Sequence, residues 1–258
     1  MNLSEKIVSE LSSSLSLELK GISKIFPGIT ANDSINFDLK EGEIHTILGE
    51  NGAGKSTLMN IIAGLFPADR GDIFVFGEKV HFSNPKQAIE RSIGMVYQHF
   101  MLVENHTVAE NIILGQSGLL KYNLTDVNRQ IKEISERYDL YVDPRKKIHE
   151  LSVGEQQRVE IVKVLFRGAR ILILDEPTAV LTPQESEALY GIMKRMTQEN
   201  HSIIFITHKM KEVMALSHRI TVLSRGRLMA TLRREETNSK KLAELMIGNI
   251  EALSLIHI

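Results

Sequence analysis

Apolar and polar residues alternate in two runs near the start of the chain, at residues 15–19 and 35–39. This period of two is typical of strands with one buried face. Pro27 and Gly28 lie between the runs and favour a turn. The pattern therefore predicts two antiparallel strands, and a third strand is expected over residues 43–48.

Helical periods dominate the two regions that follow. After the third strand, apolar residues recur at i, i+3, i+4 and i+7, at Leu58, Ile61, Ile62 and Leu65. Between Pro85 and Phe166 helical spacing prevails, and few runs look like strands. We therefore predict an inserted α-helical subdomain at about residues 86–166.

Three short apolar runs in the second half of the chain predict further strands, at residues 171–174, 203–206 and 220–223. An amphipathic helix is expected between the first two runs, with an apolar face made by Leu189, Ile192, Met193 and Met196. Strands that alternate with helices build a parallel sheet, and continuously apolar strands indicate helices on both of its faces. The chain is therefore predicted to be an α/β protein with a mainly parallel sheet and an N-terminal antiparallel β-subdomain.

Composition narrows the classes of protein open to this chain. Of its 258 residues, 43% are hydrophobic and 24% are charged, as in soluble globular domains. The net charge of -1 provides no overall attraction to nucleic acid or to anionic lipid. The sequence has no cysteine, which excludes disulfides and thiolate chemistry. We expect a cytoplasmic protein in which residues 1–14 form a mobile extension.

A glycine-rich segment joins the third strand to the first helix. It fits the pattern G-x-x-x-x-G-K-[ST] with Gly49, Glu50, Asn51, Gly52, Ala53, Gly54, Lys55 and Ser56. Such a loop points its backbone N–H groups inward, and Lys55 supplies a positive charge for β and γ phosphates. Ser56 is expected to hold Mg²⁺. The alternative is a glycine-rich turn with an exposed lysine, but the position between strand and helix favours a phosphate-binding loop.

Acidic residues and a histidine follow two of the later strands. Asp175 and Glu176 end the run at 171–174, at the edge where open α/β sheets bind ligands. Asp175 is suited to orient a metal-bound water, and Glu176 to act as a general base on an attacking water. His208 follows the run at 203–206, so we expect it at the same edge, as a candidate contact for the γ-phosphate. The alternative for the acidic pair is a solvated turn.

A second anion site is predicted at residues 151–155. Ser152 and Glu155 have the spacing of a capping box, which by itself gives this segment a structural explanation. The same helix start also offers a hydroxyl, Gly154 and free N–H groups to an anion. Two phosphate sites on one chain suggest a nucleotide held between two molecules or domains.

Together these motifs resemble the ATP-binding cassette (ABC) family, the ATPase subunits of ABC transporters, over residues 15–250. Residues 49–57, which include Thr57, match the Walker A motif, and Gln98 matches the glutamine of the Q-loop. Residues 151–157 match the signature motif and residues 171–176 match Walker B. His208 matches the switch histidine. Phe26 stands where the family has an aromatic side chain that stacks on adenine, although a core or turn role remains open for it. The resemblance implies a P-loop NTPase core.

The resemblance also implies cofactors and partners. ATP and Mg²⁺ would bind between two cassettes, so that Ser152, Gly154 and Glu155 contact a nucleotide held by Walker A of the other cassette. Gln98 would sense Mg²⁺ and the attacking water, and it joins Ser56 and Asp175 as the expected metal site. Closure of the cassettes would drive transmembrane permease subunits at the cytoplasmic face of a bacterial membrane, with an extracytoplasmic binding protein acting indirectly and no nucleic acid as partner.

In this family Gln98 lies near the cleft that receives a permease. Its apolar neighbours Phe100, Met101 and Leu102 are candidates for lining that cleft. Ordinary packing within the helical subdomain is an equal alternative for each of them.

The sequence departs from the common family pattern at three positions. Val153 and Glu155 replace glycine and glutamine in the signature, and Thr182 stands where the D-loop usually has aspartate. The segments at residues 95–103 and 176–185 nevertheless look like the first cassette of twin-cassette bacterial importers for simple sugars and nucleosides, and the nucleoside branch matches best.

Such importers carry a second cassette on the same chain. Residues 253–258 look like a translated adapter, so we predict a truncated chain in which residues 251–258 form a non-native or unstructured tail. A short natural C-terminal strand would have a similar sequence and remains the alternative.

Two other functions stay open at this point. A soluble ABC ATPase that acts on nucleic acid or ribosomes is disfavoured by the near-neutral charge and by the importer-like segment around Gln98. A nucleotide-dependent scaffold without hydrolysis would be favoured if Glu155 and Thr182 marked a degenerate site, but Glu176 and His208 indicate hydrolysis.

Overall fold

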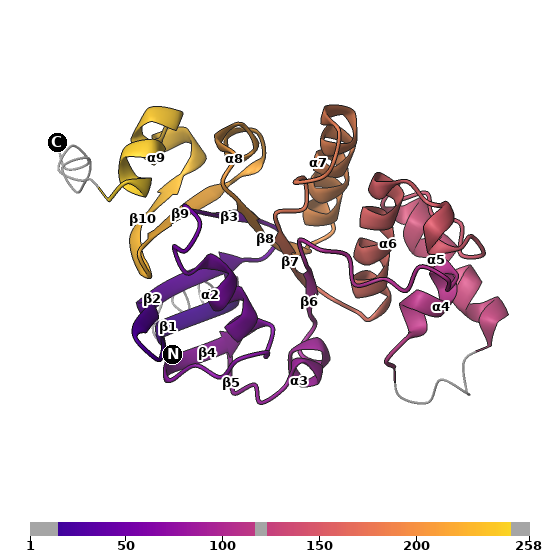
Figure 1. Cartoon of the computed structure of the whole chain (residues 1–258), viewed down its shortest axis with the longest axis horizontal. Helices are drawn as coiled ribbons and strands as arrows, with labels where there is room; N and C mark the ends of the chain where they lie inside the picture. The colour runs from indigo at the N-terminus through magenta and orange to yellow at the C-terminus, as the bar shows by residue number, and fades with distance from the viewer. Residues whose placement is uncertain (1–14, 117–122, 249–258) are drawn as a thin grey trace, which may run out of the picture.

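The computed structural model describes residues 15–116 and 123–248 (Figure 1). Two of our expectations, the extension at residues 1–14 and the tail at 251–258, lie outside the described residues.

A six-stranded sheet runs through the centre of the molecule (Figure 1). Its spatial order is β10 (Arg227–Arg233), β9 (Arg219–Ser224), β3 (Ile44–Leu48), β8 (Ser202–Thr207), β7 (Ile171–Asp175) and β6 (Ile93–Val96). All neighbours pair in parallel except β10, which is antiparallel to β9. Every residue of β3, β7 and β8 is buried, because both faces of the sheet are covered. The predicted mainly parallel sheet is confirmed.

A separate four-stranded antiparallel sheet lies against one face of the larger sheet. Its order is β2 (Ile29–Lys40), β1 (Leu15–Phe26), β4 (Arg70–Val75) and β5 (Glu78–Val80). The predicted pair of N-terminal strands corresponds to β1 and β2, which join through a tight turn at Pro27 and Gly28. Both strands are longer than the alternating runs, because irregularities in their register interrupt the period.

Alternate residues of the central strands point into two different cores. Ile171 and Ile173 pack with the antiparallel sheet and with α2 (Lys55–Ile62), the helix that follows the glycine loop. Leu172 and Leu174 pack on the opposite side with α6 (Val153–Phe166) and α7 (Pro183–Gln198). A third core lies under α8 (Met210–Leu216) and α9 (Ser239–Met246) at the β9–β10 edge.

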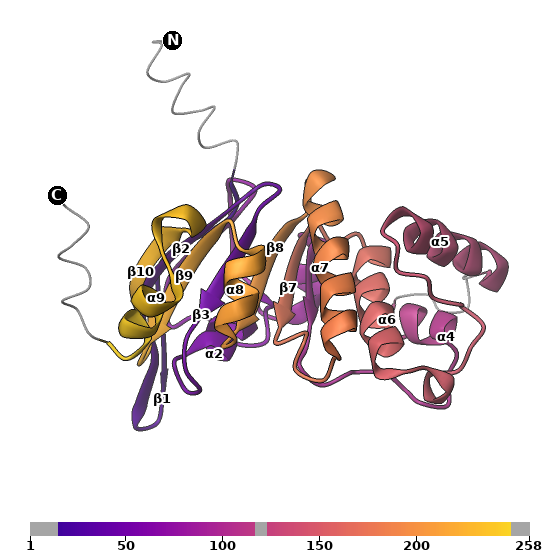
Figure 2. The same ribbon diagram turned by 90° about the horizontal axis from the view of Figure 1, so that it is seen from above.

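Helices α4 (Val108–Ile113), α5 (Leu124–Arg137) and α6 gather at one end of the molecule, away from the antiparallel sheet (Figures 1 and 2). The range of about 86–166 that we assigned to the helical subdomain also holds most of the short α3 (Pro85–Glu90) and the strand β6. Strand β6 pairs with β7 and so belongs to the central sheet. Four residues with a glycine among them are too short to produce a recognisable period.

The carboxyl ends of β3, β7 and β8 lead into three of the segments that carry the predicted chemistry. These are the glycine loop after Leu48, Glu176 after β7 and His208 after β8. Within residues 15–116 and 123–248, we find no helix with the length and apolar character of a membrane span.

Candidate nucleotide-binding site

The backbone of the glycine loop leaves no room for a side chain at Gly54. Gly54 has a φ of 96°, and a Cβ at this position would lie 2.3 Å from the carbonyl oxygen of Ala31. The side chain of the buried Asn32 donates a hydrogen bond to the Gly54 carbonyl at 3.1 Å. The positive φ and the close approach of β2 therefore both require glycine here.

Lys55 opens helix α2 and is buried at 6% exposure. Its Nζ donates hydrogen bonds to the carbonyl oxygens of Gly49 and Glu50, at 2.7 and 2.9 Å. Burial lowers the pKa of Lys55, whereas the charges of Glu176, Asp175 and Glu50 oppose that shift. The ammonium group thus sits inside the loop, where phosphate oxygens can replace the carbonyls as its partners.

A cavity of about 580 Å³ opens beside this loop. It is lined by six residues of the loop and helix start, Asn51, Gly52, Gly54, Lys55, Ser56 and Thr57, and by Phe26, Gln98, Asp175 and Glu176. The other loop residues, Gly49, Glu50 and Ala53, lie outside this lining, and Ala53 is buried beneath the loop. The structure therefore brings together most residues that the sequence singled out, from four separate segments of the chain.

Asp175 ends β7 next to Ser56. The Ser56 hydroxyl donates a hydrogen bond to the carboxylate, and burial together with the neighbouring Glu176 raises the pKa of Asp175 while Lys55 opposes that shift. With Gln98 these side chains provide a hydroxyl, a carboxylate and an amide oxygen in one cavity. Among the described residues, no three His, Cys, Asp or Glu side chains gather into a metal site. A sparse set of oxygen donors is nevertheless what Mg²⁺ uses when phosphate and water complete its shell, so the residues fit this ion.

Glu176 has a left-handed backbone conformation with a φ of 46°. Among the acidic residues of the described chain, it shares this conformation only with Asp139. Its N–H donates to the Ile206 carbonyl at 3.0 Å, which anchors it across to β8. The carboxylate Oε1 lies 2.9 Å from Nδ1 of His208. Glu176 is therefore held at the edge of the cavity by backbone and side-chain contacts, and His208 touches it directly.

A buried carboxylate links the segments that carry Glu176 and His208. Glu212 in α8 accepts hydrogen bonds from the hydroxyls of Thr178 and Thr207, at 2.6 and 2.8 Å. Thr178 lies two residues after Glu176, and Thr207 lies one residue before His208. The sequence reading missed Glu212, because the contact depends on how α8 packs beside β7 and β8.

The signature residues lie outside this cavity, at the start of α6. Ser152 is the N-cap: its hydroxyl accepts from the Glu155 N–H at 3.3 Å, and the Glu155 carboxylate accepts from the Ser152 N–H at 2.8 Å. The predicted capping box is thus present. On the described chain alone, Ser152, Gly154 and Glu155 do not join Lys55 in one site.

The structure explains why threonine can occupy position 182, where the family usually has aspartate. Thr182 caps helix α7, and its hydroxyl and N–H each donate to the Glu185 carboxylate at 2.9 Å. Together with the Gly154 N–H, these hydrogen bonds hold the pKa of Glu185 below its ordinary value. A Cβ at Gly154 would lie 2.3 Å from Glu185 Oε1. Glu185 was missed, although the Thr182 to Glu185 spacing is itself a capping-box signal.

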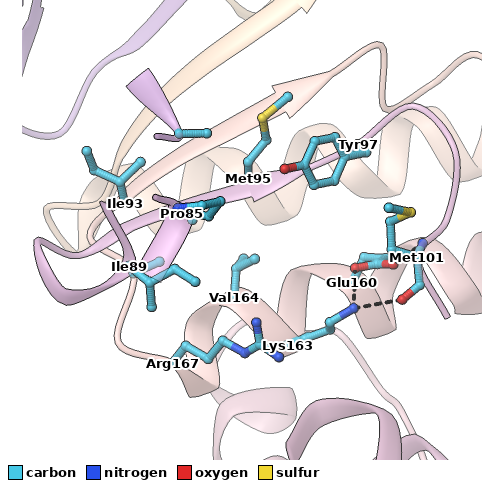
Figure 3. A pocket seen from close by; sticks show the side chains of 13 residues that line it. Pro85, Ile89, Ile93, Met95, Tyr97, Met101, Glu160, Lys163, Val164 and Arg167 are labelled. Carbon is cyan, nitrogen blue, oxygen red and sulfur yellow. Dashed lines mark hydrogen bonds and ion pairs between the residues drawn. The ribbon is translucent and has the colours of Figure 1, made fainter. Parts of the chain in front are cut away.

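Phe26 lines the cavity at the end of β1, and its ring meets Phe66 edge to face at 5.8 Å between centroids. Arg225 also lines the cavity and was not singled out, because its position after β9 becomes adjacent only through the sheet. Of the three candidates for lining a permease cleft, Met101 lines a second, apolar cavity (Figure 3). Leu102 packs against the helical core. Phe100 belongs to neither lining.

Comparison with known proteins assigns the class. Residues 32–179 match the family model described as ABC transporter. The chain belongs to this family, and its α/β P-loop fold agrees with that membership.

Individual relatives are similar over most of this chain. The guanosine import ATP-binding protein NupO of Bacillus subtilis is 54% identical, and the nucleoside import ATP-binding protein NupA of Lactococcus lactis is 50% identical. Both matches cover 90% of this chain, but the chain spans only 46% of the length of each relative. Among solved structures, a dimeric bacterial ABC transporter cassette is 27% identical with a TM-score of 0.73, over 84% of this chain and 98% of that one.

Proposed function

We propose that this chain binds and hydrolyses ATP and thereby energises the import of a nucleoside or a simple sugar. The observation that carries hydrolysis is the 2.9 Å contact between Glu176 and His208 at the edge of the glycine-loop cavity. The names of the two relatives support import and favour a nucleoside over a sugar.

The chemistry assigned to the cavity begins with binding. The N–H groups of the glycine loop and the ammonium of Lys55 hold the phosphates, and Phe26 stacks on the adenine. Ser56, Asp175 and Gln98 hold Mg²⁺, which neutralises phosphate charge when it is bound. The strong burial of Lys55 makes its charge effective, since little water screens it.

Hydrolysis then uses the carboxylate at the edge of the cavity. Glu176 accepts a proton from water while the water oxygen bonds to the γ-phosphorus and the bond to the β–γ bridging oxygen breaks. His208 keeps the carboxylate in place, because its ring nitrogen contacts Oε1 directly. Backbone anchoring of Glu176 to Ile206 adds to that positioning.

A second cassette completes the proposed assembly. The N-terminus of α6, with Ser152, Gly154 and Glu155, is assigned to a nucleotide held by the other cassette. This agrees with the dimeric state named for the solved cassette relative. Permease subunits are the proposed membrane partners, at the cytoplasmic face of a bacterial membrane, with a binding protein acting indirectly.

The apolar cavity beside Gln98 is the proposed place for a permease segment (Figure 3). Ile89, Met95 and Val164 line it, and the Met101 side chain is 64% exposed at its edge. An exposed methionine beside an apolar wall suits an apolar helix from another chain, because methionine adapts its shape to a partner.

Nucleotide binding tests the first step. Lys55→Ala removes the buried positive charge, so we expect ATP affinity to fall by at least about tenfold, as for loss of a charged hydrogen bond. The matched control is Lys79→Ala, which removes an exposed lysine paired with Asp72 on the antiparallel sheet. Equal ATP affinity of the two variants, measured by calorimetry, would contradict the assignment of the loop.

Transport tests the import function. The full-length protein and its permeases in vesicles, with ATP on the cassette side, should drive uptake of labelled guanosine. Uptake of labelled ribose without guanosine would move the substrate to the simple sugars. Intact ATP hydrolysis with no uptake of either compound would overturn the import proposal and favour a soluble ABC ATPase.

A further inference from the structure

Residues 97–101 connect the nucleotide cavity with the apolar cavity. Gln98 lines the nucleotide cavity, whereas Tyr97 and Met101 line the apolar cavity (Figure 3). The segment follows β6 and crosses toward the middle of α6 without regular secondary structure. Any displacement of its backbone therefore moves side chains in both cavities.

Helix α6 holds this segment through the backbone N–H and the carbonyl oxygen of Met101. The Met101 N–H donates to Glu160 Oε1 at 2.7 Å, and Lys163 Nζ donates to the Met101 carbonyl oxygen at 2.9 Å (Figure 3). Lys163 also pairs with Glu160 at 3.3 Å. The Met101 backbone thus forms its hydrogen bonds with two side chains one turn apart on α6, as it would with a neighbouring strand in a sheet.

The pair is buried, although Met101 itself is exposed. The Glu160 and Lys163 side chains are 5% and 14% exposed, against 64% for Met101. Removing an ion pair from water is costly, and a buried pair seldom adds much stability over apolar residues of similar size. Here each charge is matched by the other and by a backbone group of Met101, so the pair fixes where this backbone lies.

Tyr97 and Arg167 line the apolar cavity together with the pair. On the held segment, burial together with the charge of Glu160 raises the pKa of Tyr97. Arg167, one turn further along α6, donates to the Leu114 carbonyl at 2.7 Å and so is directed toward α4. The contact between α6 and the segment therefore depends on Glu160 and Lys163.

We propose that Glu160 and Lys163 are positioning residues that tie the segment of Gln98 to α6, so that a partner seated against Met101 shifts Gln98 in the nucleotide cavity. The inference rests on the proposed function, because it needs a permease partner and ATP turnover. The inference adds a physical link between the signature and Gln98, because one helix, α6, carries the signature at its start and the clamp formed by Glu160 and Lys163 further along. Motion of the helical subdomain is thereby transmitted to Gln98.

The first test measures the clamp without relying on turnover. The chain has no cysteine, so Met101→Cys provides a single site for a spin label. We expect Lys163→Met to increase the mobility of this label and Lys163→Arg to keep it low, because arginine retains the charge and the donors. Glu160→Gln, which keeps an acceptor and the side-chain size, should lie between them. Equal mobility in all of these variants would overturn the clamp.

The second test measures transmission in the full-length protein with its permeases. Lys163→Met should reduce the permease-stimulated kcat by about tenfold or more, since small displacements of catalytic groups have large effects, with the KM for ATP and the Tm nearly unchanged. Lys163→Arg should restore it, and the exposed Lys132→Met in α5 serves as a control. A parallel loss of kcat, ATP affinity and Tm would show a structural role only. Absence of turnover in the wild type would overturn the proposed function, while the spin label still decides the clamp.

Discussion

Glu176 and Gly94 illustrate how much depends on single residues in this protein. Glu176 occupies a left-handed backbone conformation, which costs about 1–3 kcal/mol for a residue with a side chain and persists only where the surroundings enforce it. Its N–H contact to Ile206 and its carboxylate contact to His208 supply that enforcement. Its position after a strand was predictable from the sequence, but its backbone conformation was not.

Gly94 in β6 allows helix α6 to approach the sheet. A Cβ here would lie 2.8 Å from the Cβ atoms of Val164 and Ala169, so Gly94→Ala should lower the free energy of unfolding by about 1–3 kcal/mol through overpacking. Gly191→Ala in α7 is the matched control. Nothing lies within 4 Å of its added Cβ, and alanine should raise helix stability by about 0.5–1 kcal/mol. Urea unfolding that gives the two variants the same sign would contradict this packing.

At the scale of elements, the sequence located the strands that contain a continuous buried apolar run. The runs at 171–174, 203–206 and 220–223 correspond to β7, β8 and β9, because burial on both faces leaves continuous apolar stretches. The missed strands are β4, β5, β6 and β10. They lie in the antiparallel sheet or at the edges of the larger one, where short length and partial exposure weaken the pattern.

A buried ion pair joins the two sheets, which no local pattern predicted. Arg219 at the start of β9 donates to both oxygens of Glu43, at 3.0 and 2.6 Å, and also to Asp38 in β2. Burial alone would raise the pKa of Glu43, but hydrogen bonds from His45, Arg219 and the Lys40 N–H lower it to about 2. The pair depends on residues 176 positions apart.

The lowered pKa of Glu43 sets an acid dependence. The folded protein keeps this carboxylate ionised below its usual pKa of 4.5. Its contribution to stability, about 3 kcal/mol, is therefore present above that pH and is lost as the pH falls toward 2. Glu43→Gln should therefore be less stable at pH 7 and lose less stability on acidification. Urea unfolding between pH 7 and pH 3 measures this, with the exposed Glu90→Gln as control. Parallel pH profiles for Glu43→Gln and the wild type would contradict the assignment.

Across the whole molecule, the sequence predicted which segments meet but not where the proposed second anion site lies. Parallel strands bring their carboxyl ends to one edge, which is why Lys55, Asp175 and Glu176 line one cavity. Ser152 lies elsewhere, since its position follows from the packing of α6 against α4 and α5. The contact of Glu185 with Gly154 likewise depends on the arrangement of two helices.

The central claim is that the glycine-loop cavity hydrolyses ATP with Glu176 as the base. Its most direct test is phosphate release by the full-length protein at saturating ATP and Mg²⁺, with nucleotide occupancy measured in the same samples. Glu176→Gln should bind ATP like the wild type and release phosphate at least about 100-fold more slowly, as for loss of a general base. Glu187→Gln, on the exposed side of α7, should match the wild type. Equal phosphate release by wild type and Glu176→Gln at equal occupancy would contradict the account.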